Sequence, residues 1–160
     1  MPTRSRRSSF LLLPLVAAVA ATLVLPSPAP AQTRFGVRAG VYTDLEEPFA
    51  GLELVSQLGR TNWWINPNFE YVFVSDGSFL TINGDFHYDF TRRGPVLPWV
   101  GGGPALIFSD PGGRADSESD IGLNLLAGLG FPVGDVIPYI QGKAILADEN
   151  EGVLAFGLRF

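Results

Sequence analysis

The sequence predicts an all-β protein, an eight-stranded antiparallel up-and-down transmembrane β-barrel that follows a signal peptide. Three observations lead to this fold class. Nearly all of the chain after Gln32 alternates between apolar and polar residues with period two, the spacing of half-buried strands. Seven clusters of turn-forming residues divide this alternation into eight segments. The apolar face carries more aromatic residues than the interior of an eight-stranded barrel can hold.

Residues 1–31 have the pattern of a secretory leader. An arginine-rich start precedes an apolar stretch from Phe10 to Leu25, and an Ala-x-Ala motif ends at Ala31. An uncleaved membrane anchor is the alternative, but the apolar stretch is short for a span and the Pro/Ser/Ala segment fits a processing site. We therefore expect a cleaved signal peptide of residues 1–31 and a barrel domain of residues 33–160. Cleavage leaves eight basic and sixteen acidic residues, a net charge of −8.

The segments after the leader are about 8–13 residues long, above the usual mode of about 5–6 for a strand. None shows helical periodicity. The turn clusters between them are, in order, DLEEP, GRTN, SDGS, TRRGPV, SDPGGRADSESD, PVGD and DENEG. An even number of long strands joined by turns is typical of an up-and-down barrel. In chain order, the expected strands are Arg34–Asp44, Phe49–Arg60, Asn62–Val74, Phe79–Phe90, Leu97–Phe108, Ile121–Phe131, Ile137–Ala147 and Val153–Phe160.

The volume of the side chains decides which face lines the interior. The face opposite the aromatic residues is rich in glycine and carries charges of both signs, which suits a narrow barrel. A soluble ligand-binding barrel would have to bury the aromatic face, so we expect that face to contact lipid. The aromatic residues of the apolar face are Phe35, Phe69, Tyr71, Phe73, Phe86, Tyr88, Phe90, Phe131, Phe156 and Phe160.

An exported, cysteine-free chain of eight alternating strands that ends in a Gly-x-x-Phe strand resembles the OmpA/OmpX-type small outer-membrane barrels. The resemblance implies an outer-membrane location in a Gram-negative-type bacterium, with outer-membrane lipids and lipopolysaccharide as neighbours. It also implies that the last strand is the recognition signal for the barrel-assembly machinery. The residues that match this signal are Phe156, Gly157, Leu158 and Phe160.

If the apolar residues point outward, the alternation along each strand directs a set of polar residues into the barrel. An isolated buried charge costs several kcal/mol, so the inward charges should pair and plug the lumen rather than line an open pore. The turns predict Glu70 opposite Asn83 and Asn124 opposite Lys143, whereas the fifth strand has too much glycine on both faces to be phased. The expected ion-pair network is Arg38, Glu53, Glu70, Asp85, Lys143 and Arg159. The other inward polar residues are Gln57, Asn66, Asn68, Thr81, Asn83, His87, Asp89, Asn124 and Gln141.

His87 is the only histidine and the first residue to test for catalysis. Lipid A deacylases on a similar barrel pair a histidine with a serine in a His-x-Ser pattern, but here the run is His87-Tyr88-Asp89. Because nothing supplies the nucleophile, we expect no enzyme activity and assign His87 to the lumen network. The sequence indicates no cofactor.

The connections between strands differ in charge at the two ends of the barrel. Eleven of the sixteen acids fall on the first, third, fifth and seventh connections, which would face outside, with Arg114 as the only base. A solvated loop surface explains this pattern; a divalent-cation site that bridges to lipopolysaccharide is the alternative. The weak candidate ligands are Asp116, Glu118 and Asp120, where Ile121 and Ala127 replace the glycine and glutamate of an EF-hand.

The sequence as a whole favours a non-enzymatic, monomeric integral outer-membrane barrel with a structural, surface-contact or envelope-integrity role. A lipid-modifying enzyme on the same barrel and a soluble periplasmic ligand-binding barrel are the alternatives. The strongly negative charge argues against a nucleic-acid partner, which would need a basic footprint.

Overall fold

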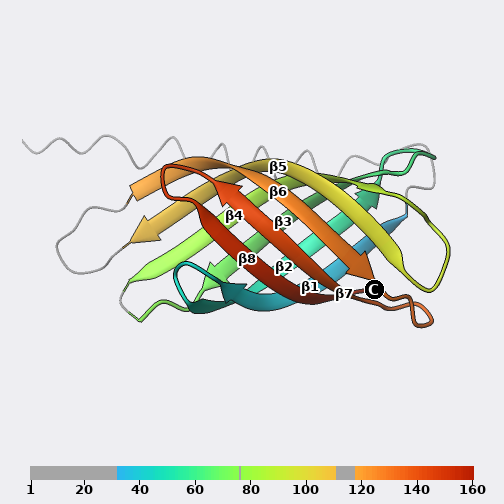
Figure 1. Ribbon diagram of the computed structural model, residues 1–160, viewed down its shortest axis with the longest axis horizontal. Coiled ribbons are helices and arrows are strands. Elements are labelled where there is room, and N and C mark those ends of the chain that lie inside the picture. The colour runs from blue at the N-terminus through green and yellow to red at the C-terminus, as the bar shows by residue number, and fades with distance from the viewer. Residues whose placement is uncertain (1–31, 76, 111–117) are drawn as a thin grey trace, which may run out of the picture. The chain divides into compact units, whose positions relative to one another are not determined.

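The computed structural model describes residues 32–75, 77–110 and 118–160. The expected signal peptide, residues 1–31, lies outside the described residues. Eight long strands make up most of the described chain (Figure 1). They are β1 (Thr33–Tyr42), β2 (Glu47–Gln57), β3 (Trp63–Val72), β4 (Ser78–Asp89), β5 (Leu97–Asp110), β6 (Glu118–Gly130), β7 (Ile137–Leu146) and β8 (Glu151–Arg159).

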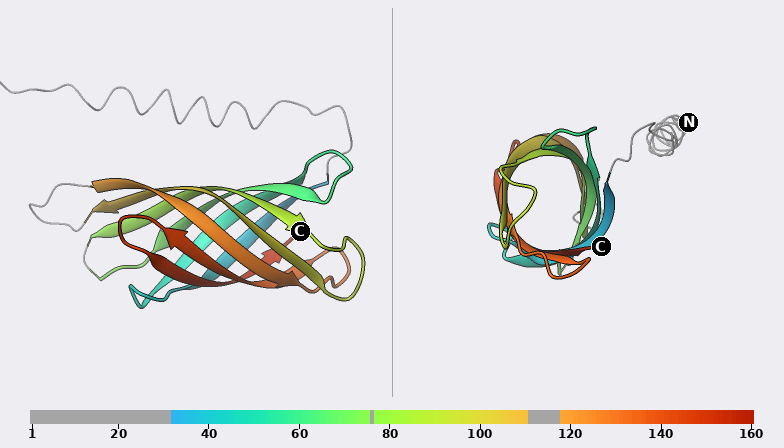
Figure 2. Two further views of the ribbon diagram at one scale, coloured as in Figure 1. Left: turned by 45° about the horizontal axis from the view of Figure 1, so that its top comes forward. Right: turned by 90° about the vertical axis from the view of Figure 1, so that its right-hand side faces the viewer.

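Each strand pairs antiparallel with the next, and β8 pairs with β1 to close the barrel. The closing seam runs from Gly36 opposite Arg159 to Tyr42 opposite Val153. An end-on view shows the closed ring of strands (Figure 2, right). The predicted eight-stranded up-and-down barrel is therefore confirmed. No helix among the described residues is long and apolar enough to cross a membrane.

The register differs by two residues from the one that the turns predict. Glu70 lies opposite Thr81 rather than Asn83, and Asn124 lies opposite Ile145 rather than Lys143. In each hairpin the centre of the connection is one residue away from the expected place; in the β6–β7 hairpin Gly134, with φ 62°, follows Val133 in the turn. A shift of one residue in the turn moves the pairing by two, so the inward and outward faces stay the same.

The hairpin of β5 and β6 is longer than expected. The sequence predicts a loop over residues 109–120, but Ser109 pairs with Glu118 and Ile107 with Asp120. The inward and outward alternation of β5 and β6 continues into this polar segment. Two neighbouring strands can keep their backbone hydrogen bonds beyond the apolar part of the barrel. The polar side chains of this extension then project into water.

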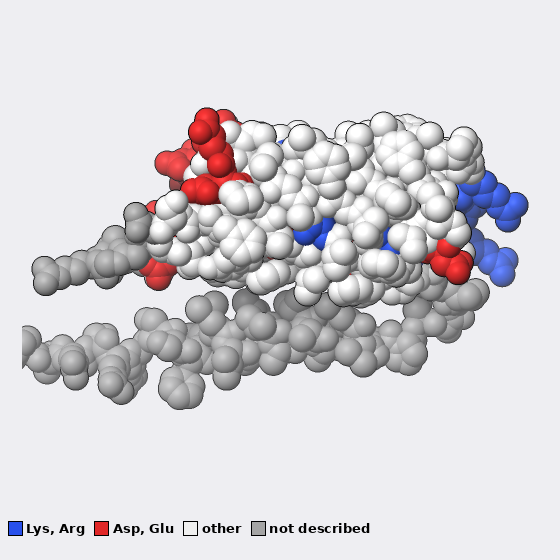
Figure 3. Space-filling model, turned by 90° about the horizontal axis from the view of Figure 1, so that it is seen from below, with Lys and Arg blue, Asp and Glu red and all other residues white. Residues whose placement is uncertain are grey.

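Large apolar side chains cover the outside of the barrel on every strand. Phe35, Leu52, Phe86 and Phe156, for example, are 42–57% exposed although they lie within regular strands. In the space-filling view, acidic groups gather at one end of the barrel and most basic groups at the other, with a largely uncharged band between them (Figure 3). A soluble domain rarely exposes so large a continuous apolar surface.

Glycine allows strands to approach closely at the inner wall. A Cβ atom on Gly40 of β1 would collide with the backbone oxygen of Leu154 in β8. In β5, a Cβ on Gly103 would collide with the backbone oxygen of Gly84. The structure also shows which residues of β5 point inward: Trp99 and Ala105 are buried, whereas Val100 points outward.

We expect Gly40→Ala to impair closure of the barrel, because the added methyl group meets backbone atoms that cannot move aside. Gly142→Ala is the matched control, since a Cβ there has no neighbour within 4 Å. The measurement is the fraction of refolded chain that shows heat-modifiable migration in detergent gels. Equal folded fractions for the two variants would contradict the close approach at the seam.

Candidate functional site

The interior of the barrel holds all fifteen polar residues that the alternation directs inward. Every one of them is less than 9% exposed. They come from β1, β2, β3, β4, β6, β7 and β8, so the polar interior is built by almost the whole ring of strands. A closed set of strands with this much buried charge must satisfy its charges internally.

Five of the six residues expected in the ion-pair network form one continuous chain of alternating charge. Lys143 Nζ lies 2.7 Å from Glu70 Oε2, and Arg38 Nη2 lies 3.1 Å from Glu70 Oε1. Arg38 Nη1 is 3.7 Å from Glu53 Oε2, and Arg159 Nε donates to Glu53 Oε1 over 2.8 Å. The chain therefore runs Lys143–Glu70–Arg38–Glu53–Arg159 across β7, β3, β1, β2 and β8.

Asp85, the sixth expected member, lies in a separate cluster of amides. Its two carboxylate oxygens accept hydrogen bonds from Asn124 Nδ2 at 2.7 Å and Asn68 Nδ2 at 2.8 Å. Asn83 donates to the Oδ1 atom of Asn68 and accepts from Asn124. In the described residues, no base lies within ion-pair distance of Asp85, so its direct partners are amide donors rather than a cation.

Three interior aromatic residues were not predicted as part of the network. The Tyr42 hydroxyl donates to Glu70 Oε2 at 2.5 Å, which gives this carboxylate a third partner. The guanidinium carbon of Arg159 lies 4.7 Å from the ring centroid of Trp99 and 4.4 Å from that of Tyr139. Such contacts are attractive, because the faces of aromatic rings carry partial negative charge.

Glycines on the neighbouring strands give these aromatic rings their room. Trp99 pairs across the ladder with Gly128, and Tyr139 pairs with Gly157. A Cβ atom on either glycine would overlap the ring opposite. Inward glycine beside an inward aromatic residue is thus the sequence signal that could have placed both rings in the lumen.

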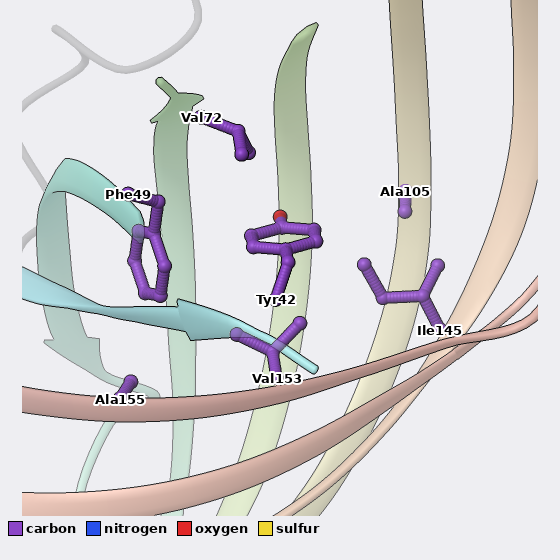
Figure 4. Packing of buried hydrophobic residues seen from close by; sticks show 7 residues of the cluster. All are labelled: Tyr42, Phe49, Val72, Ala105, Ile145, Val153 and Ala155. Carbon is purple, nitrogen blue, oxygen red and sulfur yellow. The ribbon is translucent and has the colours of Figure 1, made fainter. Parts of the chain in front are cut away.

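A cluster of apolar side chains fills the interior between the ion pairs and the acidic end. Tyr42 and Ile145 are at most 1% exposed and lie among residues of four other strands (Figure 4). Water is excluded where these side chains meet, which strengthens the electrostatic interactions beside them. The members are Tyr42, Phe49, Val72, Ala105, Ile145, Val153 and Ala155.

His87 lies toward the other end of the lumen, between two indole rings. It stacks on Trp64 with an interplanar angle of 9° and lies 5.8 Å from the centroid of Trp99. Its Nε2 atom is 3.5 Å from Asp89 Oδ1. A small pocket borders His87, and none of its described lining residues is a serine, threonine or cysteine. The described lining of this pocket therefore offers His87 no hydroxyl or thiol group to activate.

The residues expected to form the assembly signal lie on both faces of β8. Phe156, Leu158 and Phe160 point outward, and Gly157 faces the ring of Tyr139. The Phe160 amide donates to the carbonyl oxygen of Phe35 at 2.8 Å, which extends the pairing of β8 with β1. This bond anchors the last residue beside the first strand, and recognition of the segment by an assembly machinery stays a prediction.

The carboxylates at the acidic end hold the loops together. Asp44 accepts a bond from the Gly152 amide at 2.9 Å, and Glu151 accepts one from the Asp44 amide at 2.8 Å. Asp120 accepts one from the Asp148 amide at 3.1 Å. Of the weak metal candidates, Asp116 lies outside the described residues. Within the described ranges, no group of three or more His, Asp or Glu side chains is close enough to hold a metal ion.

Comparison with known proteins supports the fold alone. No protein-family model matches the chain, and no curated protein matches it. Among solved structures, the N-terminal β-barrel domain of Pseudomonas aeruginosa OprF has a TM-score of 0.70 at 14% identity, over 81% of this chain and 98% of that domain. This chain has the fold of the small outer-membrane barrels.

Two further structures share this fold. Neisserial surface protein A has a TM-score of 0.63 at 17% identity, over 81% of this chain and 97% of that protein. The attachment invasion locus protein Ail of Yersinia pestis has a TM-score of 0.55 at 17% identity, over 80% of this chain and 97% of that protein. At these identities, the side chains of the lumen have to be interpreted from this chain itself.

Removal of Lys143 should destabilise the barrel strongly. Lys143→Met leaves Glu70 without its closest cation, and breaking a buried ion pair typically costs about 3–5 kcal/mol. The neighbouring Ala144 points outward, so Ala144→Leu should change the free energy of unfolding by less than about 1 kcal/mol. Urea unfolding in detergent micelles measures both variants. Equal stabilities would mean that the ion pairs do not support the fold.

Proposed function

We propose that the chain is an integral outer-membrane barrel without enzyme activity, with a structural, surface-contact or envelope-integrity role and a lumen that does not conduct. The observation that carries this proposal is the reversal of the usual faces: apolar residues cover the outside and an ion-paired set of charges fills the inside. Lipid is the environment that accepts such an exterior. The resemblance in fold to outer-membrane barrels supports the same location.

The proposed orientation places the acidic loops outside the cell and the basic turns in the periplasm. In barrels of this kind the chain enters from the periplasm, so the β1–β2, β3–β4, β5–β6 and β7–β8 connections would reach the surface. Described acids at this end include Asp44, Glu118, Asp120 and Asp148. Figure 3 shows the two charged ends.

The acidic end favours cationic rather than polyanionic surface partners. Carboxylates without a matching number of bases create a negative potential that extends about a Debye length, near 8 Å at physiological salt. Divalent cations would accumulate there and could bridge to the phosphates of lipopolysaccharide. Ail has been solved with a heparin analogue, sucrose octasulfate, but a sulfated ligand would be repelled by this end of the present chain.

Three layers of interior contacts support a closed lumen. The apolar cluster around Tyr42 and Ile145 fills the acidic end, and the ion-pair chain crosses the middle. Toward the basic end, Trp99 and Tyr139 pack around Arg159. An ion would have to separate buried pairs to pass. We therefore propose that the wild-type barrel acts as a monomeric surface and envelope component rather than a channel.

Cell fractionation and conductance together test this function. We expect the protein to sediment with outer membranes and to give no large, steady single-channel currents in planar bilayers. Sustained conductance of the wild type would contradict the closed lumen, and recovery in the soluble periplasmic fraction would contradict membrane insertion.

A charge on the outer face should be costly near the middle of the membrane. Ile82→Arg places a cation on an outward position of β4, where about 2–4 kcal/mol of stability should be lost. Leu158→Arg lies near the proposed periplasmic boundary and should cost less, because the cost falls to about 0–1 kcal/mol at the interface. Unfolding in lipid vesicles measures the difference. If Ile82→Arg were harmless, the outer face would not contact the hydrocarbon of the bilayer.

A further inference from the structure

A small pocket opens at the basic end of the barrel, beneath the layer of aromatic rings. Its volume is about 70 Å³, and its walls include Trp64, His87, Trp99 and Ile137. A single water molecule needs about 10–15 Å³ of such a volume, so the pocket has room for about five non-hydrogen atoms. The exposed Arg92 and half-buried Arg34 lie at its rim and connect it with solvent.

The pocket carries a positive charge that the described residues do not neutralise. Arg34, Arg92 and Arg159 line it, against one carboxylate, Asp89. Arg159 is already paired with Glu53. Of the other two arginines, Arg34 Nη1 donates to the carbonyl oxygen of Asp135 and Arg92 Nη1 to that of Arg60, both at 3.3 Å. In the described ranges neither has a carboxylate within ion-pair distance, so the lining side chains keep one unit of positive charge, to which cleavage after Ala31 would add the α-amino group of Gln32.

Buried hydrogen-bonding atoms also point to a missing partner. Trp64 is 6% exposed, and its indole N–H faces the Asp89 side chain without a hydrogen bond of normal length and angle. Asp89 is 8% exposed, and its Oδ1 atom faces His87 at 3.5 Å without a hydrogen bond. Buried polar atoms are normally satisfied, so this loosely paired donor and acceptor at the wall of one pocket leave room for a polar ligand to bond with either of them.

We propose that this pocket binds a small carboxylate. In the full chain, residues 1–160, a monoanion balances the single excess positive charge of these side chains, whereas Asp89 would repel the second charge of the phosphate dianion. The guanidinium groups of Arg34 and Arg92 retain donors that match the fork of a carboxylate. The Trp64 indole supplies a further donor, and the rings of Trp64 and Trp99 supply apolar walls for one or two carbon atoms.

The ligand reaches the pocket from the periplasm if the orientation under the proposed function holds; binding itself does not depend on that orientation. The same carboxylate chemistry has two sources, a free small acid or the carboxyl end of a peptide. An amide beside the carboxylate could also donate to Asp89, which would favour the peptide end.

Tryptophan fluorescence can test the proposal with the full chain refolded in detergent micelles, where binding is measured separately from location. Trp64 and Trp99 line the pocket and report its occupancy. Acetate, N-acetylglycine and inorganic phosphate are titrated at constant ionic strength. We expect saturable changes with the two carboxylates, with dissociation constants on the order of millimolar for so few atoms. At mildly alkaline pH, where inorganic phosphate is mainly the dianion, it should bind at least about tenfold more weakly, because Asp89 repels its second charge.

Two double variants with equal charge changes identify the site. Arg34→Gln with Arg92→Gln removes both rim arginines and should weaken acetate binding about tenfold or more. Arg60→Gln with Arg93→Gln removes two arginines at the same end that do not line the pocket, and should leave binding within about twofold. Heat-modifiable migration verifies that each variant is folded.

The outcomes separate the sources and the alternatives. Tighter binding of N-acetylglycine than of acetate assigns the site to a peptide end, and equal binding assigns it to free small acids. The absence of saturation, tighter binding of phosphate, or equal weakening in both double variants would overturn the proposal.

Discussion

The narrow interior of an eight-stranded barrel is the constraint on which the rest of this structure depends. Charges inside it are removed from water and must find partners within the ring of strands. The chain Lys143–Glu70–Arg38–Glu53–Arg159 meets this demand with contacts from five strands. These strands include β8 and β1, which are far apart in sequence and meet at the seam. The same ion pairs that satisfy the buried charges therefore also link the two ends of the chain.

The narrow interior also limits how many large side chains the lumen can hold. Space for Trp99 and Tyr139 exists because glycine stands opposite each ring, and Tyr42 reaches Glu70 from a cluster of buried apolar residues. Aromatic residues in excess of this space are found outside, where they cover the strands. The outer surface and the lumen are thus two results of one limit on interior volume.

The sequence was most informative for features that depend only on the alternation of inward and outward residues. Alternation assigned Arg38, Glu70 and Lys143 to the interior, and the structure buries each of them. It could not assign partners, because pairing depends on register, and a turn displaced by one residue moved Glu70 from Asn83 to Thr81. Asp85 illustrates the same limit: parity places it inside, but only the three-dimensional arrangement brings amides rather than a base to its carboxylate.

The central claim is that outward positions contact lipid and inward positions are shielded from it. The chain has no cysteine, so single cysteines can carry spin labels at successive positions of β4 without further changes. In lipid vesicles, collision with oxygen should peak at residues 80, 82, 84, 86 and 88, with minima at 81, 83, 85 and 87. A profile with the opposite phase, or one without period two, would contradict the account.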